Sequence, residues 1–237
     1  EVAGHRRGRR PVLIGAVMTL SASNEDYLKA IWKINEWQEE PVTSGQLAKT
    51  LGLSPSTVSE GVSRLASLGL VRHAPYGAVR LTEEGQQQAA RMVRTHRLLE
   101  TGLVQIFGYS WDEVHDEAER LEHAVSDLFV ERLDHRLGHP GRDPHGDLIP
   151  APDEFETPKH IPISLAAAER GATVCVERVS DRESDVLVYL QGAGIVPGMS
   201  VTVELDQPDP HLLAIVSAGI RSTIPLTAAR AVIIANQ

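Results

Sequence analysis

Residues 45–65 read GQLAKTLGLSPSTVSEGVSRL, and this stretch predicts two short helices joined by a tight turn. The first helix spans Gly45 to Leu51, and Gly52-Leu53-Ser54 supplies the turn. Ser54-Pro55 then gives the second helix a serine N-cap with proline in its first turn. That helix stops near Gly69.

Two short β-like runs follow, Leu70-Val71-Arg72 and Ala78-Val79-Arg80-Leu81, with Pro75-Tyr76-Gly77 as the turn between them. Helix, tight turn, second helix and hairpin is the order of a winged helix-turn-helix. The alternative is a purely structural subdomain of the same shape.

Charge favours a nucleic-acid interface at this place. The formal net charge of the 237 residues is −9, so DNA binding requires a local basic patch. Between Val42 and Arg97, seven lysines and arginines stand against three glutamates. Short hydroxyl side chains and helix N–H groups can approach phosphates and bases together. The expected DNA contacts are Ser54, Ser56, Thr57, Ser59 and Arg64.

Helical periodicity extends on both sides of this motif. A first helix is expected with Ser23 as N-cap and with Pro41 at its end. Thr82 to Gly85 begins a long helix through Phe107, and one further helix runs from Trp111 to about Leu137.

The C-terminal part has a different pattern. Glycines and prolines gather in residues 138–160, which are expected to form a linker with an ordered start. Beyond them, short β-branched runs separated by turn residues predict a small β-barrel. The chain is therefore expected to be mainly α with a β domain. The single cysteine, Cys175, fits a strand core and a reducing compartment.

The N-terminus has two interpretations. His5-Arg6-Arg7-Gly8-Arg9-Arg10 precedes an apolar run, which is the order of a secretory signal. The favoured interpretation is that translation starts at Met18 and that residues 1–17 lie upstream of the protein. No apolar run reaches the roughly 20 residues that a bilayer span needs.

The segment Val114–His123 carries the strongest chemistry. At about 100° per residue, His115, Glu119, Glu122 and His123 share one helix face, beside a separate apolar stripe that includes Leu128. Imidazole and carboxylate together suit divalent Mn, Fe, Co or Zn. The preceding helix adds His96 and Glu100, and the first helix adds Asp26. Ligands from three helices would clamp those helices together.

The alternative is that these side chains form an acidic, solvated helix face. Against it, Glu119 and Glu122 would repel each other with no basic partner nearby except Arg120, which points elsewhere. The other histidines are assigned to loops or the surface: His5, His73, His135, His139, His145, His160 and His211.

Six ordered motifs carry a family resemblance over residues ~20–150. They are Asn24-Glu25-Asp26-Tyr27-Leu28, Ser56-Thr57-Val58-Ser59, His96-Arg97-Leu98-Leu99-Glu100, Val114-His115-Asp116-Glu117-Ala118-Glu119, Glu122-His123-Ala124-Val125-Ser126-Asp127 and Asp143-Pro144-His145-Gly146-Asp147-Leu148-Ile149-Pro150. Together they resemble the diphtheria toxin repressor family, in particular its manganese-responsive regulators. The C-terminal segment resembles the family's SH3-like domain more loosely.

The resemblance implies an organisation in five parts. These are an N-terminal extension (1–19), a winged helix-turn-helix DNA-binding domain (20–82), a helical metal-binding and dimerisation domain (83–150), a linker (151–160) and an SH3-like, FeoA-like domain (161–237).

The resemblance also implies how the metal ligands are divided. Asp26, Glu119, Glu122 and His123 match one metal position, and His96, Glu100 and His115 match an ancillary position, although His96 also fits a paired-metal arrangement. The SH3-like domain is a further source of ligands, with Glu177, Asp181 and Glu183 as candidates. One departure is Lys29, because short manganese regulators carry a glutamate three residues after the aspartate.

The expected function is a cytoplasmic, homodimeric repressor that binds palindromic operator DNA when loaded with Mn(II), with Fe(II), Co(II) or Zn(II) as substitutes in vitro. The protein is not expected to be an enzyme, and no catalytic residues or small-molecule substrate are expected. It is not expected to bind a membrane. Asp26 and Glu119 replace the methionine and cysteine of iron-responsive relatives, which favours manganese. The alternatives are an iron-dependent repressor of the same family, a hydrolytic metalloenzyme and a metal-independent DNA-binding protein.

Overall fold

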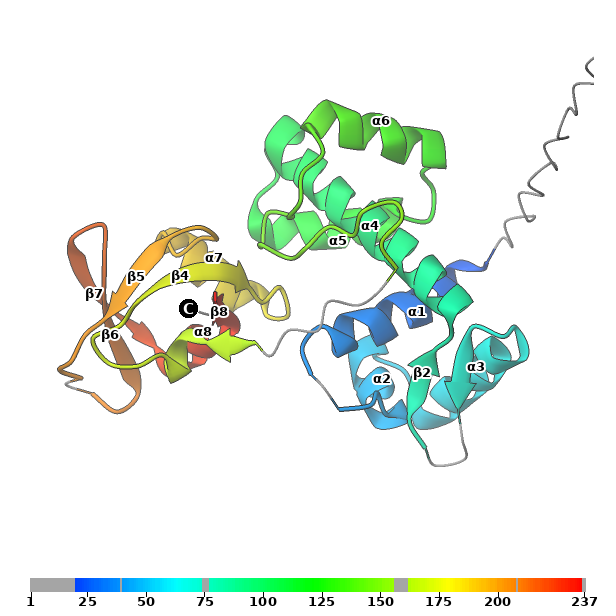
Figure 1. Ribbon diagram of the computed structural model, residues 1–237, viewed down its shortest axis with the longest axis horizontal. Coiled ribbons are helices and arrows are strands. Elements are labelled where there is room, and N and C mark those ends of the chain that lie inside the picture. Colours follow the sequence, from blue (N-terminus) through cyan, green and yellow to red (C-terminus); the bar gives the residue numbers. More distant parts are fainter. Residues whose placement is uncertain (1–19, 39, 74–76, 156–161, 208, 236–237) are drawn as a thin grey trace, which may run out of the picture.

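The computed structural model describes residues 20–38, 40–73, 77–155, 162–207 and 209–235. The interpretations of residues 1–19, of Pro75-Tyr76 in the hairpin turn, of His160 and of the linker from residue 156 fall outside these ranges. Figure 1 shows three bodies: a helical N-terminal domain, a second helical body that contains most of α4, and a C-terminal sheet with its own helices.

The N-terminal domain is a winged helix-turn-helix. Thr43 and Ser54 cap α2 and α3 with their side chains, and Gly52 ends α2 in the left-handed conformation at φ 64°. Buried apolar side chains of α1, α2, α3 and the hairpin form its core together with the start of α4. Its elements are α1 (Ala22–Asn35), α2 (Ser44–Leu51), α3 (Pro55–Ser67), β1 (Val71–His73) and β2 (Val79–Leu81).

The expected bounds of the first helix were wrong at both ends. Ser21, not Ser23, is the N-cap, because its hydroxyl oxygen accepts the N–H of Asn24. Helix α1 ends at Asn35, well before Pro41. Glu36 follows as the C-cap, and its buried carboxylate accepts hydrogen bonds from Trp32 and Arg97. A buried ion pair therefore lies at the end of this helix.

Three helices form the second body. They are α4 (Glu83–Phe107), α5 (Trp111–Leu121) and α6 (Asp127–Leu137). The single helix expected from Trp111 to Leu137 was wrong, because residues 122–126 form a turn and Ser126 caps a new helix. Glu122 and His123 consequently lie in that turn, and Leu128 is 59% exposed on α6 instead of packing with the apolar stripe of α5.

The segment after α6 is ordered against the helices. Arg142 and Leu148 form an isolated β-bridge, and the Asp143 carboxylate accepts the backbone N–H groups of His145 and Asp147, both at 2.9 Å. His145 lies in a loop, as expected, but its side chain is buried. The carboxylate of Asp143 therefore stabilises the backbone of this turn.

The C-terminal domain is a six-stranded antiparallel sheet of order β3-β8-β4-β5-β6-β7. Trp111 of α5 packs into the core of this domain, which joins it to the helical body. Its elements are β3 (Ile163–Ser164), η1 (Leu165–Ala167), β4 (Thr173–Val179), α7 (Ser184–Gly192), β5 (Ser200–Val203), β6 (Leu212–Ser217), β7 (Ile220–Pro225), α8 (Leu226–Ala231) and β8 (Val232–Ile234).

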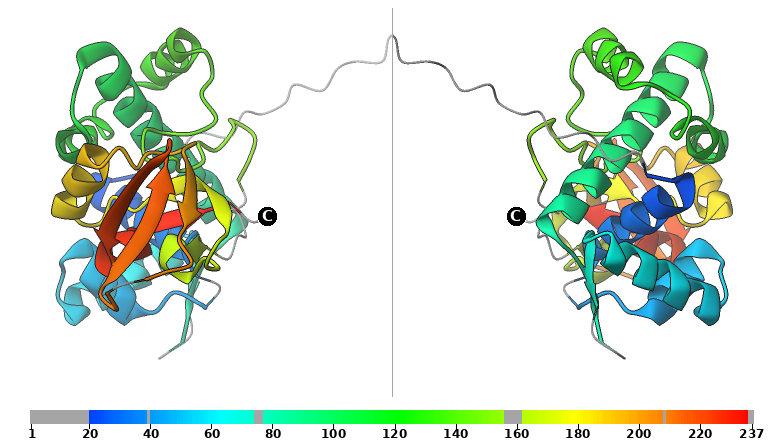
Figure 2. Two further views of the ribbon diagram at one scale, coloured as in Figure 1. Left: turned by 90° about the vertical axis from the view of Figure 1, so that its left-hand side faces the viewer. Right: turned by 90° about the vertical axis from the view of Figure 1, so that its right-hand side faces the viewer.

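Cys175 lies on β4 as expected, but its side chain is exposed, not in the core. The strand alternates, and Val174 and Val176 on either side of it face inward. In the left view of Figure 2 the sheet domain faces the viewer, in front of the helical part of the molecule. Within the described residues, no helix is long and apolar enough to cross a membrane.

Gly85 marks a close approach between α4 and the hairpin. A Cβ atom added there would lie 1.9 Å from the carbonyl oxygen of Leu70, which already accepts the N–H of Thr82 at 3.0 Å. The backbone at this junction has no room for a side chain.

We predict that Gly85→Ala lowers the free energy of unfolding by about 2–3 kcal/mol, because the backbone must move to admit the methyl group. Gly45→Ala is the matched control, since the atom nearest to a Cβ added there would be the hydroxyl oxygen of Thr43 at 3.9 Å. Urea unfolding followed by circular dichroism measures both. Equal midpoints for the two variants would contradict the prediction.

Candidate metal centre and nucleic-acid interface

The residues expected to read DNA lie at the start of α3 and along its outer face. Ser54, Ser56, Thr57, Ser59 and Arg64 are all exposed. At the helix start the Ser54 hydroxyl is hydrogen-bonded to two others, with its Oγ 2.9 Å from Ser56 Oγ and 2.8 Å from Thr57 Oγ1. The helix N-terminus thus presents hydroxyls to solvent, which suits a phosphate oxygen, although Ser54 already caps the backbone N–H of Thr57.

The basic patch is smaller than its charge count suggests. Arg91, Arg94 and Arg97 pair with Asp127, Asp134 and Glu36. The exposed basic residues of the DNA-binding domain are Lys49, Arg64, Arg72 and Arg80. The positive surface is therefore concentrated on the helix-turn-helix and its hairpin, where phosphate contacts are needed.

Asp26, Glu122 and His123 form one group of metal-ligand type, whose ligand atoms lie within 4.8 Å of one another. His123 Nε2 is 2.9 Å from Asp26 Oδ1 and 3.4 Å from Glu122 Oε1. A pocket of about 130 Å³ opens beside Glu122 and His123. We call these three residues the α1–α5 cluster, because they join α1 to the turn after α5.

Glu100, His115 and Asp181 form a second group by the same measure, which we call the domain-junction cluster. His115 Nδ1 lies 3.1 Å from Glu100 Oε1 and 3.7 Å from Asp181 Oδ2. Asp181 follows β4 in the C-terminal domain, so this group joins α4, α5 and that domain. Among the three C-terminal candidates, Asp181 is the one that lies in a ligand group.

His96 lies between the two clusters. Its Nδ1 is 2.6 Å from Glu122 Oε2, and its Nε2 is 3.0 Å from Glu100 Oε1. Glu119 forms a group with His96 and His115. The resemblance had instead implied that Glu119 shares a position with Asp26. One buried imidazole thus contacts a carboxylate of each cluster.

The surroundings keep the key carboxylates of Glu122 and Glu100 ionised. Burial acts to raise the pKa of Glu122, but hydrogen bonding and charge from His96, together with the Lys29 ammonium, hold that pKa below its usual value. Burial also acts to raise the pKa of Glu100. The charge of His96, with hydrogen bonds from His115 and His96, nevertheless keeps the pKa of Glu100 well below its usual value. Ionised carboxylates beside imidazoles are the form that binds a divalent cation.

Sequence reasoning missed four neighbours of these clusters. Lys29 Nζ donates to Glu119 Oε1 at 2.7 Å and also contacts Glu122 Oε1, so the argument that only Arg120 was near was wrong. Lys33 Nζ lies 2.8 Å from Asp181 Oδ2, and Glu25 Oε2 lies 2.7 Å from His123 Nδ1. The sequence did carry a signal for Lys29. It lies one helical turn after Glu25 and Asp26, so its side chain is expected on the same side of α1 as the Asp26 ligand. His145, the fourth, belongs to a motif already singled out for its resemblance.

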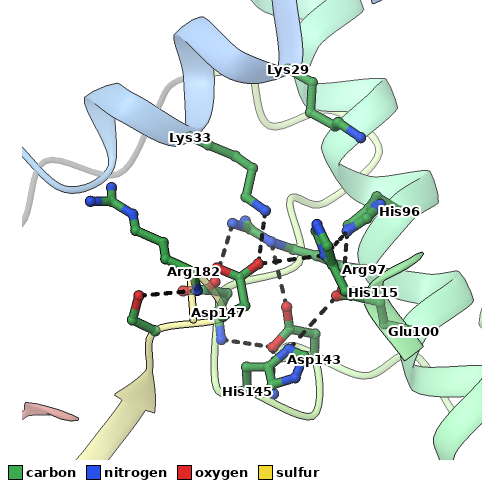
Figure 3. Close-up of polar contacts among 12 residues, drawn as sticks. Lys29, Lys33, His96, Arg97, Glu100, His115, Asp143, His145, Asp147 and Arg182 are labelled. Carbon is green, nitrogen blue, oxygen red and sulfur yellow. Dashed lines mark hydrogen bonds and ion pairs between the residues drawn. The ribbon is translucent and has the colours of Figure 1, made fainter. Parts of the chain in front are cut away.

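Arg97 is the centre of a buried ionic network (Figure 3). The guanidinium is 2.6 Å from Glu36 Oε2, 3.6 Å from Asp143 Oδ2 and 3.7 Å from Asp147 Oδ2. Asp147 also accepts from Arg178 of β4 at 2.9 Å, and Arg178 donates to the backbone oxygen of Glu36. Arg178 lies over the Trp37 ring, 3.8 Å from its centroid.

Glu100, Asp143 and His145 form a further buried group of ligand type. Here a cation is already provided by Arg97, and Asp143 is committed to the backbone N–H groups of its own turn. Burial, with the charges of Asp147 and Glu100, raises the pKa of Asp143 well above its ordinary value. We therefore interpret this group as part of the ionic network and not as a metal site.

Comparison with known proteins assigns the chain to a family. It matches the iron dependent repressor N-terminal DNA binding domain over residues 19–79, the iron dependent repressor metal binding and dimerisation domain over residues 82–151, and the FeoA domain over residues 163–236. It is 33% identical over 223 residues to the iron-dependent repressor IdeR of Mycobacterium leprae, covering 89% of this chain and 95% of that protein. The chain belongs to the diphtheria toxin repressor family. It is a metal-dependent transcriptional repressor of that family, whose members are regulators and not enzymes.

Other relatives extend the likeness. The diphtheria toxin repressor of Corynebacterium diphtheriae is 37% identical over 199 residues, which is 80% of this chain and 87% of that protein. A manganese-dependent transcriptional repressor in complex with manganese superposes with a TM-score of 0.82 at 41% identity, covering 90% of this chain and all of that one. The structure of ScaR with bound Zn²⁺ superposes with a TM-score of 0.73 at 32% identity, covering 90% of this chain and 99% of that one. Proteins described as iron-dependent and proteins described as manganese-dependent are thus both similar to this chain.

We predict that Arg97→Met lowers the free energy of unfolding by about 3–5 kcal/mol, because buried carboxylates lose their cation. Arg91→Met is the matched control: Arg91 and its partner Asp127 are 44% and 76% exposed, and such surface pairs contribute about 1 kcal/mol or less. Chemical denaturation of the two variants measures the difference. A loss no larger than that of the control would show that the network contributes little to stability.

Proposed function

We propose that this repressor is activated by manganese and binds palindromic operator DNA as a homodimer. The observation that carries the choice of metal is the donor chemistry of the α1–α5 cluster and the domain-junction cluster. All of their ligand-type groups are carboxylates and imidazoles. Hard oxygen donors improve the relative standing of Mn(II) against metals that prefer sulfur or nitrogen.

Two further observations support the proposal. One similar solved protein, a manganese-dependent transcriptional repressor in complex with manganese, is 41% identical to this chain. Apolar side chains at the end of α4 and on α6 are exposed: Ile106, Phe107, Leu128 and Phe129, at 46%, 71%, 59% and 48%. Exposed large apolar side chains favour an interaction site, and the dimerisation domain is the part that carries these four.

The proposed ligands are Asp26, Glu122 and His123 at one position and Glu100, His115 and Asp181 at the other, with His96 and Glu119 beside both. A divalent ion would supply positive charge that ties their carboxylates and imidazoles together. Asp26 lies on α1, which packs directly against α3 in the DNA-binding domain, and Glu122 and His123 follow α5. Closing this cluster would set the position of the recognition helix relative to the dimerisation domain. A metal that binds this arrangement better shifts the population toward it.

The rival within the family is an iron-activated repressor, because the curated relatives include iron-dependent proteins. The test is fluorescence anisotropy of an operator, selected from random DNA by the manganese-loaded protein, titrated with Mn(II), Fe(II) and Zn(II) without oxygen. We expect no binding in chelator and the fullest binding with Mn(II), and we expect Asp26→Met with Glu119→Cys to shift the response toward Fe(II). Equal responses of the wild type to Mn(II) and Fe(II) would refute the choice of metal. Equal binding with and without chelator would refute metal activation.

The assignment of α3 as the DNA-reading helix gives a separate prediction. Ser56→Glu with Thr57→Glu places two carboxylates at the helix start, where they repel phosphate. We expect the double variant to lose operator binding and to keep its metal affinity, measured by calorimetry. Ser184 and Asp185 begin α7 in the other domain, so Ser184→Glu is a control for adding charge at a helix start. Normal operator binding by the double variant would mean that α3 is misassigned.

A further inference from the structure

Two lysines on α1 contact carboxylates of the two metal-ligand clusters. Lys29 and Lys33 are one helical turn apart, so they lie on the same face of the helix. Their side chains are only 6% and 23% exposed. Figure 3 shows both reaching from α1 toward the side chains of α4.

Each ammonium contacts the carboxylate oxygen that a metal would need. Lys29 contacts Glu122 Oε1, which is also the oxygen 3.4 Å from His123 Nε2 in the α1–α5 cluster. Lys33 contacts Asp181 Oδ2, which is also the oxygen 3.7 Å from His115 Nδ1 in the domain-junction cluster. An ammonium and a divalent cation on one oxygen would repel each other strongly in a poorly solvated place.

The lysines have a physical role in the metal-free protein. The clusters, with Glu119 beside them, bring five carboxylates close together. Glu100 and Glu122 are buried and Asp181 is 10% exposed, whereas Asp26 and Glu119 are partly exposed. Such a set is costly unless it is paired with positive charge. The two lysines provide this charge, since Lys33 Nζ lies 2.8 Å from Asp181 Oδ2 and Lys29 Nζ lies 2.7 Å from Glu119 Oε1.

Lysine is well suited to leave such a site. Its charge is a compact ammonium on a flexible four-carbon stem, whereas arginine would bind a carboxylate through a rigid fork. Lys29 joins α1 to α5 and the turn after it, as the α1–α5 cluster does. Lys33 joins α1 to the C-terminal domain, which the domain-junction cluster joins to α4 and α5.

We infer that Lys29 and Lys33 are internal cations that hold the two clusters in the metal-free protein and must be displaced when a divalent ion is bound. They therefore raise the metal concentration at which the protein responds, one lysine for each cluster. This inference rests on the proposed function, because it takes the two clusters as metal sites.

The test is calorimetric titration of the metal-free full-length protein with Mn(II), with Lys29→Gln and Lys33→Gln compared to the wild type. Each variant should tighten one of the two binding events by about tenfold, because a competing close charge pair is removed. The melting temperature of the metal-free variants should fall, and its rise on adding Mn(II) should be larger than in the wild type. Lys49→Gln removes the same charge from an exposed position and should change neither value.

Two further measurements separate competition from a structural role. Lys29→Arg and Lys33→Arg keep the positive charge and should not tighten binding. In the wild type, mass spectrometry after amine acetylation should show that Mn(II) increases labelling of Lys29 and Lys33 but not of Lys49. The labelling does not depend on whether a variant folds.

Unchanged or weaker Mn(II) binding in both glutamine variants would overturn the inference, as would equal tightening in the arginine variants. Protection of the two lysines by Mn(II) in the wild type would overturn it too. If the wild type binds no Mn(II), Fe(II) or Zn(II), the proposed function itself fails, which is a different result.

Discussion

The arrangement of the whole chain depends on the ion pairs that the buried guanidinium of Arg97 makes. This guanidinium faces three carboxylates that belong to the end of α1 and to the turn after α6, and one of these also pairs with Arg178 of the C-terminal domain. A charge is costly to bury unless it is paired and hydrogen-bonded. The three parts of the molecule therefore meet where they can satisfy this one cation.

That constraint determines the position of the candidate metal residues. His96 and Glu100 lie on either side of Arg97 along α4, so the network that holds α1 against α4 also places Asp26, Lys29 and Lys33 beside them. Metal-ligand groups and ionic network share one buried polar layer. Carboxylates in that layer divide among three kinds of cation: arginine, which stays, lysine, which can move, and the proposed metal.

Much of this could be predicted from local patterns. The cap at Ser54, the hairpin and the long helix beginning after Thr82 were confirmed, because each depends on residues within one turn of the chain. The β domain predicted from the β-branched runs was confirmed, and its sheet is antiparallel. The break between α5 and α6 was missed, because Ser126 as an N-cap competes with a helical pattern that continues through it. The ligand residue types were evident from sequence, but the pairing of Glu119 with His96 and not with Asp26 was not.

The sequence by itself determined the order of the modules, the identity of the donor side chains and the family, since these depend on residue type and spacing. Only the tertiary structure decided which donors meet, that His145 is buried, and that Lys29 and Lys33 contact the carboxylates. The reason is physical. An ion pair between α1 and the turn after α5 joins residues about 90 positions apart, and its geometry comes from helix packing that no local pattern encodes.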